Sequence, residues 1–459
     1  MSSIQNLYEK ERKLDLDSII VGEVKIWAFI RNYIGSRLMF NQNRRVYLDK
    51  KLFFHIAKNL FYGSRALFVS QYEHVVFSSS DQRKKMGGKY VDRIDYLAEI
   101  LPGKFLFIEL PNPNHYSLSS IPTKYIISKY VIYLLEFLYG KFLYRKGVIE
   151  NEQLLKDVLN EFSIDEDYNA LIKKFFCQYG VMNWLIKRYG IKNMFIANAY
   201  TNMGYVLACK ENGCRVVEFQ HGIVNSTHYA YNVYKDYGRG LYPDYLFVFG
   251  NKEKEIFTED NYLIKSEKVI PIGNFYIDYI LQHDNPDQTK FRELTKPYKK
   301  TVAVAIQDAF EQQIIDFLRE AASIDSTIGY VLMPRKQTHL YYTSFDLPEN
   351  VIYCDFLNTY EIIKECDFHS TMTPTTAIES PSLGTRNVLM NIDNMAKEYY
   401  EKILQKPVTY FADTPVLMVK LINDSEFLSR EEITLSNSDI IAKEYKENLT
   451  RAVKSIFND

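Results

Sequence analysis

A histidine lies at the end of a short apolar run in the middle of the chain. The run 216–219, Val-Val-Glu-Phe, leads directly into Gln220, His221 and Gly222. Such a run predicts a buried strand, and open α/β sheets bind ligands beyond the carboxyl ends of their strands. Imidazole exchanges protons near neutral pH, and glycine lets a ligand approach the backbone closely. We therefore predict that His221 is catalytic and that Gln220 and Gly222 bind the ligand; the alternative is a turn with a structural histidine.

Two carboxylates in the N-terminal half also follow predicted strands. Asp81 lies in the polar loop 79–89, after a strand predicted over 75–78, and Glu109 lies near the end of a strand predicted over 104–110. A carboxylate in such a position can remove a proton from a substrate hydroxyl. Asp81 and Glu109 are thus candidate catalytic bases, and a structural role is the alternative for each.

The C-terminal half contains a stretch rich in hydroxyl groups between a predicted strand, 367–370, and a predicted helix, 375–383. Hydroxyls and a proline near the first helical turn are typical of a helix start, where free backbone N–H groups can bind phosphate. We predict a diphosphate site here, with ordinary helix capping as the alternative, and Glu379 as an acceptor for ribose hydroxyls. The remaining candidate ligands are Ser370, Thr371, Thr373, Thr375 and Thr376.

Two cations follow the strand predicted over 329–333. Arg335 and Lys336 lie beyond its carboxyl end, where their charges could neutralise phosphate oxygens. We predict that both bind the nucleotide, and ordinary surface charge is the alternative.

Strands and helices alternate in the segments that would position these groups. A strand at 194–197, a helix at 201–212 and a strand at 215–219 form a βαβ unit, which predicts a parallel sheet. The same alternation restarts at residue 301.

The polar, proline-bearing segment 283–300 separates the two alternating regions. We predict an α/β protein with two Rossmann-like parallel-sheet domains facing a central cleft. Residues 1–282 would form the first domain, 301–437 the second, and 283–300 the linker, while 438–459 would form a helix packing back across both.

Three further segments have apolar patterns that predict local structure. Residues 66–70 have the pattern of a strand, and residues 90–101 that of a helix. Residues 125–144 predict a mostly buried helix, interrupted by three charges, with docking on a membrane surface as the alternative.

Composition excludes several classes of protein. The 459 residues carry a net charge of −1, which argues against a strongly basic nucleic-acid-binding protein. The five cysteines include no CxxC pair, and no metalloprotease or phosphate-binding P-loop motif is present, so we predict neither a zinc site nor another metal centre. The first 20 residues are too charged for a secretory signal, and no uncharged apolar stretch reaches 18 residues. These features predict a cytoplasmic protein.

Several of these segments together resemble bacterial surface-polysaccharide glycosyltransferases of the GT-B fold, including the sialyltransferase and Kdo-transferase-like groups. The resemblance extends over about residues 190–392, and wall-teichoic polymerases and nucleotide-sugar epimerases share parts of it. It implies metal-independent transfer of a sugar from a nucleotide-sugar donor, without a separate cofactor, to a glycan or lipid-linked glycan acceptor. A CMP-linked donor is favoured, with UDP- and GDP-linked donors as alternatives, and the implied location is the inner face of the plasma membrane. The segments that carry the resemblance are 216–222, 243–250, 269–274, 370–371 and 375–380.

One motif departs from this family pattern. Many CMP-sugar enzymes of the type have a His-Pro motif where this chain has Met333-Pro334-Arg335-Lys336. The departure motivates one alternative, a scaffold of the same fold without catalytic activity. A second alternative is a CDP-polyol phosphotransferase of the teichoic-acid type, which would use the same fold and the same His221.

Overall fold

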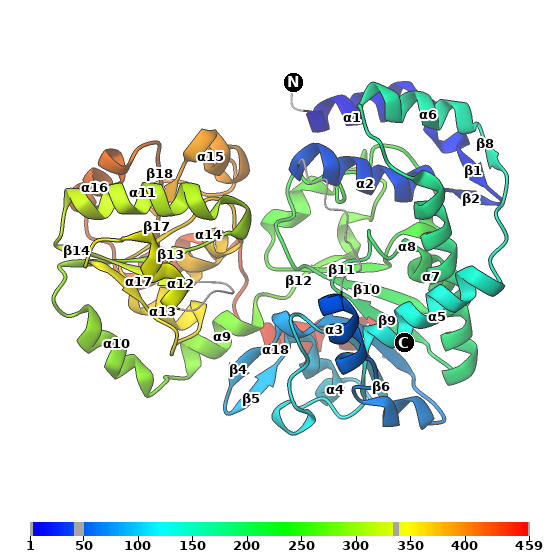
Figure 1. Cartoon of the computed structure of the whole chain (residues 1–459), viewed down its shortest axis with the longest axis horizontal. Helices are drawn as coiled ribbons and strands as arrows, with labels where there is room; N and C mark the ends of the chain where they lie inside the picture. The colour runs from blue at the N-terminus through cyan, green and yellow to red at the C-terminus, as the bar shows by residue number, and fades with distance from the viewer. Residues whose placement is uncertain (1–2, 41–49, 334–338, 458–459) are drawn as a thin grey trace. The chain divides into compact units, whose positions relative to one another are not determined.

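The computed structural model describes residues 3–40, 50–333 and 339–457. The chain forms two compact units. Unit 1 contains the residues up to Val248, residues 253–270 and the residues from Thr450 onward, whereas unit 2 contains residues 249–252 and 271–449. Each unit is built around its own parallel β-sheet (Figure 1).

The sheet of unit 1 has the strand order β12-β11-β10-β9-β3-β6-β7, and the neighbours from β11 to β7 are parallel. These strands are short runs of β-branched and aromatic residues, as expected for strands buried on both faces. They are β3 (His74–Ser79), β6 (Phe105–Leu110), β7 (Ile126–Ser128), β9 (Asn193–Ile196), β10 (Arg215–Phe219), β11 (Tyr245–Val248) and β12 (Val269–Pro271). The shorter strands are β1 (Ile20–Val21), β2 (Val24–Lys25), β4 (Lys84–Met86), β5 (Lys89–Val91) and β8 (Ile149–Glu150).

Two apolar cores hold the helices of unit 1 against this sheet. One packs α5, α7 and α8 against β3, β6 and β9, and the other packs α2, α6 and α7 near β11. The helices are α1 (Ser3–Lys13), α2 (Trp27–Phe40), α3 (Lys50–Leu60), α4 (Leu97–Ile100), α5 (Lys129–Phe142), α6 (Glu152–Glu161), α7 (Tyr168–Tyr189) and α8 (Met203–Glu211).

Unit 2 has an all-parallel sheet of strand order β15-β14-β13-β16-β17-β18, with α11 and α16 packed against it. Its strands are β13 (Lys300–Ala305), β14 (Ile328–Met333), β15 (Val351–Tyr353), β16 (Phe368–Ser370), β17 (Arg386–Met390) and β18 (Thr409–Ala412). Its helices are α9 (Phe275–Gln282), α10 (Asp287–Thr295), α11 (Glu311–Ile324), α12 (His339–Tyr342), α13 (Thr359–Glu365), α14 (Thr376–Glu379), α15 (Met395–Tyr400), α16 (Pro415–Asp424) and α17 (Arg430–Ser436), and α18 (Tyr445–Phe457) begins in unit 2 and ends in unit 1.

The prediction of two Rossmann-like parallel-sheet α/β domains is confirmed. The predicted domain limits stay a prediction. The segment proposed as a linker contains a helix, α10, and α9 belongs to unit 2.

Two local predictions are wrong. Residues 66–70 do not form a strand: Ser64–Phe68 is a 3₁₀ turn, in which Phe68 is 84% exposed. Residues 90–101 are helical only over α4, because Lys89–Val91 pairs with β4 and Asp92 starts a separate 3₁₀ turn by capping it. Apolar content alone does not distinguish these 3₁₀ turns from a strand or a longer helix.

The helix predicted over 125–144 is confirmed only over α5, and the prediction that it is mostly buried is wrong. Ile126–Ser128 is an edge strand paired with β6, and α5 follows it. One side of α5 is exposed, including Phe137 at 63% and Phe142 at 65%. No helix in the described part of the chain is long and apolar enough to cross a membrane.

Candidate active site and nucleotide site

The carboxyl end of β10 carries the predicted Gln220-His221-Gly222 segment. Gln220 is buried, and its side-chain Nε2 donates to the Gly222 carbonyl at 2.9 Å and to Glu253 Oε1 at 3.0 Å. These bonds fix the turn in place. Nothing lies within 4 Å of the point where a Cβ of Gly222 would be, so the backbone is open there, as the sequence predicted for a close approach.

His221 itself is half-buried, and its Nδ1 is buried without a hydrogen-bond partner. The ring lies 6.1 Å from that of Tyr200, which follows β9. Burial, aided by the positive charge of Arg93, lowers the pKa of His221 to about 4. His221 is therefore neutral at pH 7, and it can accept a proton without first having to lose one.

His228 lies close to His221, on the loop that follows β10. Its ring contacts Tyr200 and Tyr231, at 5.8 and 4.9 Å between centroids. Burial and the neighbouring His221 lower the pKa of His228 to about 3, so this second imidazole is also neutral.

Glu218 lies on β10, three residues before His221, and was not among the predicted site residues. It is 2% exposed, and its Oε1 accepts a hydrogen bond from Tyr231 Oη at 3.0 Å. Burial raises the pKa of Glu218 to about 7. The carboxyl group thus exchanges its proton in the physiological range, which is the property required of a general acid or base. The sequence signal was available, since Glu218 is the single charged residue within the apolar run 216–219.

Together these groups form a cluster near the end of β10, which we call the β10 cluster and which consists of Glu218, His221, His228, Tyr200 and Arg93. The cluster contains one carboxyl group that titrates near pH 7, two neutral imidazoles and one guanidinium. Perturbed groups gathered at the carboxyl end of a parallel strand are typical of an active site.

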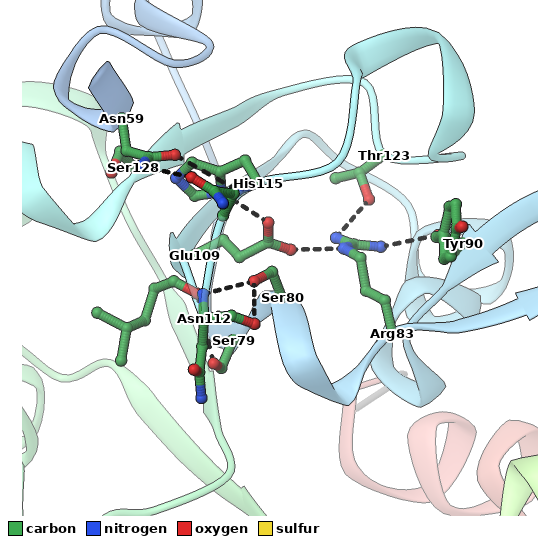
Figure 2. Close-up of polar contacts among 12 residues, drawn as sticks. Asn59, Ser79, Ser80, Arg83, Tyr90, Glu109, Asn112, His115, Thr123 and Ser128 are labelled. Carbon is green, nitrogen blue, oxygen red and sulfur yellow. Dashed lines mark hydrogen bonds and ion pairs between the residues drawn. The ribbon is translucent and has the colours of Figure 1, made fainter. Parts of the chain in front are cut away.

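Glu109 lies in a different environment, three strands away in the sheet order β10-β9-β3-β6. Its carboxylate accepts from Arg83 Nε at 2.5 Å and is 2.9 Å from His115 Nδ1. Figure 2 shows both contacts. Arg83 also donates to Asp95 Oδ2 at 2.7 Å and to Thr123 Oγ1 at 3.0 Å. The side chains of Arg83 and Glu109 are 0% and 1% exposed. The structure thus places Glu109 in a buried ion-pair network, where its carboxylate already has two partners.

Asp81 lies beside this network on the 3₁₀ turn Ser80–Gln82, and it is exposed. Its Oδ1 accepts from Ser79 Oγ at 2.6 Å and its Oδ2 from Asn112 Nδ2 at 2.9 Å. Asp81 and Glu109 are therefore neighbours near the ends of β3 and β6, whereas His221 belongs to the cluster at β10. A catalytic role for Asp81, Glu109 or His221 stays a prediction.

Most of the predicted hydroxyl ligands of unit 2 lie in the loop between β16 and α14. Thr371 Oγ1 donates to the Ala305 carbonyl at 3.3 Å, and Thr373 Oγ1 donates to Gln307 Oε1 at 2.5 Å. By contrast, the buried hydroxyls of Ser370 and Thr376 have no hydrogen-bond partner among the described residues. Two buried hydroxyl groups without partners at the two ends of one loop indicate a place where a ligand can supply the missing hydrogen bonds.

Glu379 closes this loop at the end of α14 and is 4% exposed. Its Oε1 accepts from Asn274 Nδ2 and from Tyr360 Oη, both at 2.9 Å, and its Oε2 accepts from Thr375 Oγ1 at 3.4 Å. The carboxylate therefore anchors the loop to two other segments of unit 2. Its predicted contact with a ribose stays a prediction, as do the ligand roles of the hydroxyl residues.

The other predicted cations, Arg335 and Lys336, lie outside the described residues. Within the described part of the chain, no group of three or more His, Cys, Asp or Glu side chains is arranged to hold a metal ion.

Comparison with known proteins gives a fold but no family. No protein-family model matches the chain, and no curated protein sequence matches it. Solved structures do match. S. aureus MnaA in complex with UDP has a TM-score of 0.51 at 13% identity, over 84% of this chain and 97% of its own. The UDP-GlcNAc 2-epimerase of Neisseria meningitidis, bound to UDP-GlcNAc, has a TM-score of 0.50 at 14% identity, over 84% and 99%.

These matches correct the predicted function. The enzyme named in the second structure is an epimerase, and epimerases rearrange one substrate instead of transferring a sugar to an acceptor. The prediction of a glycosyltransferase, with its acceptor and its role in surface-polysaccharide assembly, is wrong by this comparison. What the shared architecture shows is that the chain has a GT-B-like fold of two Rossmann-like domains.

Proposed function

We propose that this protein is an isomerase of UDP-sugars, and specifically an enzyme that inverts C2 of a UDP-N-acetylhexosamine. The substrate class comes from the fold, which matches nearly the whole length of structures that were solved with UDP or with UDP-GlcNAc. The reaction class is inferred from the β10 cluster of unit 1, to which we assign proton transfer.

The observation that carries the proposal is Glu218, a buried carboxyl group whose pKa is about 7. Inverting a carbon centre requires that a proton leave one face of the sugar and that a proton return to the other face. The first step needs a base and the second an acid, and a group that titrates near the working pH can serve in either step. Glu218 fits this requirement, and His221 is a neutral second group that shares Tyr200 as a neighbour with Glu218.

Unit 2 supplies the features expected of a nucleotide site. The hydroxyls of Ser370 and Thr376 are buried without partners, and a diphosphate or ribose would supply acceptors for both. Glu379 keeps this loop in place through Asn274, Tyr360 and Thr375. The proposal therefore assigns nucleotide binding to unit 2 and proton transfer to unit 1.

Incubation with UDP-GlcNAc in D₂O tests the function directly. We expect ¹H NMR to show a second set of sugar signals from the C2 epimer, together with loss of the H2 signal as solvent deuterium replaces it. The reason is that a proton removed by a carboxylate exchanges with solvent before it returns. Release of free UDP without an epimer would indicate hydrolysis and contradict the proposal, as would an unchanged spectrum.

The nucleotide site predicts a separate effect on binding. Ser370→Ala and Thr376→Val should each weaken UDP binding by roughly 2- to 12-fold, the range expected for one lost hydrogen bond. Isothermal titration calorimetry with UDP measures this. Thr289→Val, an exposed threonine on α10, is the matched control and should leave the affinity unchanged. Affinities equal to that of the wild type in both site variants would refute the assignment.

A further inference from the structure

Unit 1 exposes large apolar side chains on two helices that lie beside each other. The ring of His55 on α3 meets that of Tyr130 at the start of α5, with 5.7 Å between centroids. On α3, Phe53 and Phe54 are 66% and 70% exposed, and Phe61 directly after it is 75% exposed. We call these residues, together with the exposed apolar residues of α5, the α3–α5 face.

The spacing of the exposed residues gives α5 one apolar side. On α5, Leu134, Phe137 and Phe142 are 45%, 63% and 65% exposed. Leu134 and Phe142 on α5 are eight residues apart, so they lie on one side of that helix. Solvent-exposed apolar groups that gather in this way mark an interaction surface.

Lysines and arginines outnumber acidic residues in the segments that carry this face and in α7, which packs against α5. The segments 50–70, 121–149 and 168–190, which include α3, α5 and α7, carry thirteen lysines and arginines and a single acidic residue, Glu136. Glu136 is half-buried and accepts a hydrogen bond from the buried Tyr205, so it is turned away from solvent. Lys141, Arg145 and Lys146, at the end of α5 and just after it, are exposed.

These observations distinguish between two partners that could cover the α3–α5 face. A second copy of the chain related by a two-fold axis would place the same surface against itself and bring lysines and arginines together without acidic partners. An anionic phospholipid surface matches both features, because acyl chains accept the phenylalanines and headgroup phosphates attract the cations. We propose that the α3–α5 face docks unit 1 onto an anionic phospholipid bilayer.

The geometry restricts this contact to the bilayer surface. α5 has 14 residues, which corresponds to a length of about 21 Å and is too short to cross a hydrocarbon core of about 30 Å. Its inner side is also occupied, since Ile132 is fully buried in the core of unit 1. The helices therefore lie in the plane of the interface with only their exposed sides in contact with lipid.

Flotation of the full-length protein with vesicles tests the proposal. The wild type should float with vesicles of about 40% phosphatidylglycerol in phosphatidylcholine, and much less with phosphatidylcholine alone. Raising NaCl from about 0.05 to about 0.5 M should reduce binding, because salt screens the cations. The combined substitution Phe54→Ser, Phe137→Ser and Phe142→Ser should lower the partition coefficient at least tenfold, and replacing Lys141, Arg145 and Lys146 by glutamine should lower it several-fold.

Phe427→Ser provides the matched control, since Phe427 is 89% exposed but lies in unit 2. It should bind vesicles like the wild type. Because the replaced phenylalanines are exposed, all variants should keep the unfolding temperature of the wild type. Wild-type protein that stays unbound with both vesicles, or that binds both equally, overturns the proposal. So does a dimer in light scattering that the triple serine variant converts to a monomer without any change in flotation, because the face would then join two copies.

Discussion

Replacing Arg83 by leucine should lower the unfolding temperature of the protein by roughly 6–20 °C. The guanidinium is fully buried and holds Glu109 at 2.5 Å and Asp95 at 2.7 Å. Removing one partner of a buried ion pair leaves the other charge without compensation and costs about 3–5 kcal/mol. A loss of that size corresponds to the stated shift for a domain of about 150–250 residues. Differential scanning calorimetry measures it.

An ion pair whose arginine is exposed is the control for Arg83. Arg292 binds Glu365 through Nε at 2.7 Å and through Nη2 at 3.0 Å; the Arg292 side chain is 64% exposed and that of Glu365 is 9% exposed. Arg292→Leu should cost less than about 1 kcal/mol because water screens the pair. Equal shifts for Arg83→Leu and Arg292→Leu would show that burial of the network is not what stabilises it.

The loss of stability caused by Arg83→Leu should also depend on pH in a defined direction. Burial raises the pKa of Asp95 to about 6 in the wild type, even though Arg83 opposes that rise. Without Arg83 the pKa rises further, so the folded variant binds a proton that the unfolded chain does not bind between about pH 4 and this higher value. Its stability relative to the wild type should therefore be greater at pH 5 than at pH 8.

The two buried glutamates show what the sequence could and could not predict. Glu109 and Glu218 both occur near the ends of apolar runs, and both runs form parallel strands as their residue types indicate. What separates them is the partner of each carboxylate. Arg83 is 26 residues from Glu109 in sequence, so no local pattern could show that Glu109 is neutralised while Glu218 has only hydroxyl and backbone donors.

The same limitation explains the wrong predictions of burial on the surface and the contact that was missed in unit 2. Phe137 and Phe68 are apolar but exposed, because burial depends on what packs over a helix or turn and not on its own composition. In unit 2 the strand and the hydroxyl-rich loop were predicted from local residue types. The Asn274 partner of Glu379, 105 residues away in sequence, could only be found from the structure.

Glu218→Gln should reduce the rate of UDP-GlcNAc epimerisation by about 100- to 10,000-fold, which is the usual contribution of a general acid or base. Glutamine has the same shape and keeps an oxygen that can accept the hydrogen bond of Tyr231, but it cannot take up or release a proton. The ¹H NMR assay measures the loss. Glu150→Gln, at an exposed position of unit 1, is the control and should react at the wild-type rate.

The pH profile should identify the group. If ionised Glu218 is the base, kcat/KM of the wild type rises with pH and levels off above about 7, the pKa of Glu218. The residual activity of Glu218→Gln should not show this rise of kcat/KM with pH. A variant with wild-type rates, or with an unchanged rise, would show that the titrating group is another residue.

The substitution Glu218→Gln should raise the stability of the protein above pH 7 although it lowers the activity. Burial raises the pKa of Glu218 from 4.5 to about 7, so the folded state binds this proton more tightly than the unfolded chain does. The resulting stability is complete below about pH 4.5 and is lost as the pH rises through about 7, a difference of roughly 3 kcal/mol. Glutamine has no proton to lose, so Glu218→Gln should unfold at a higher temperature than the wild type at pH 8 and at a similar temperature at pH 4.5. A protein that keeps a destabilising carboxylate in its core, and becomes more stable but inactive without it, uses that carboxylate for chemistry.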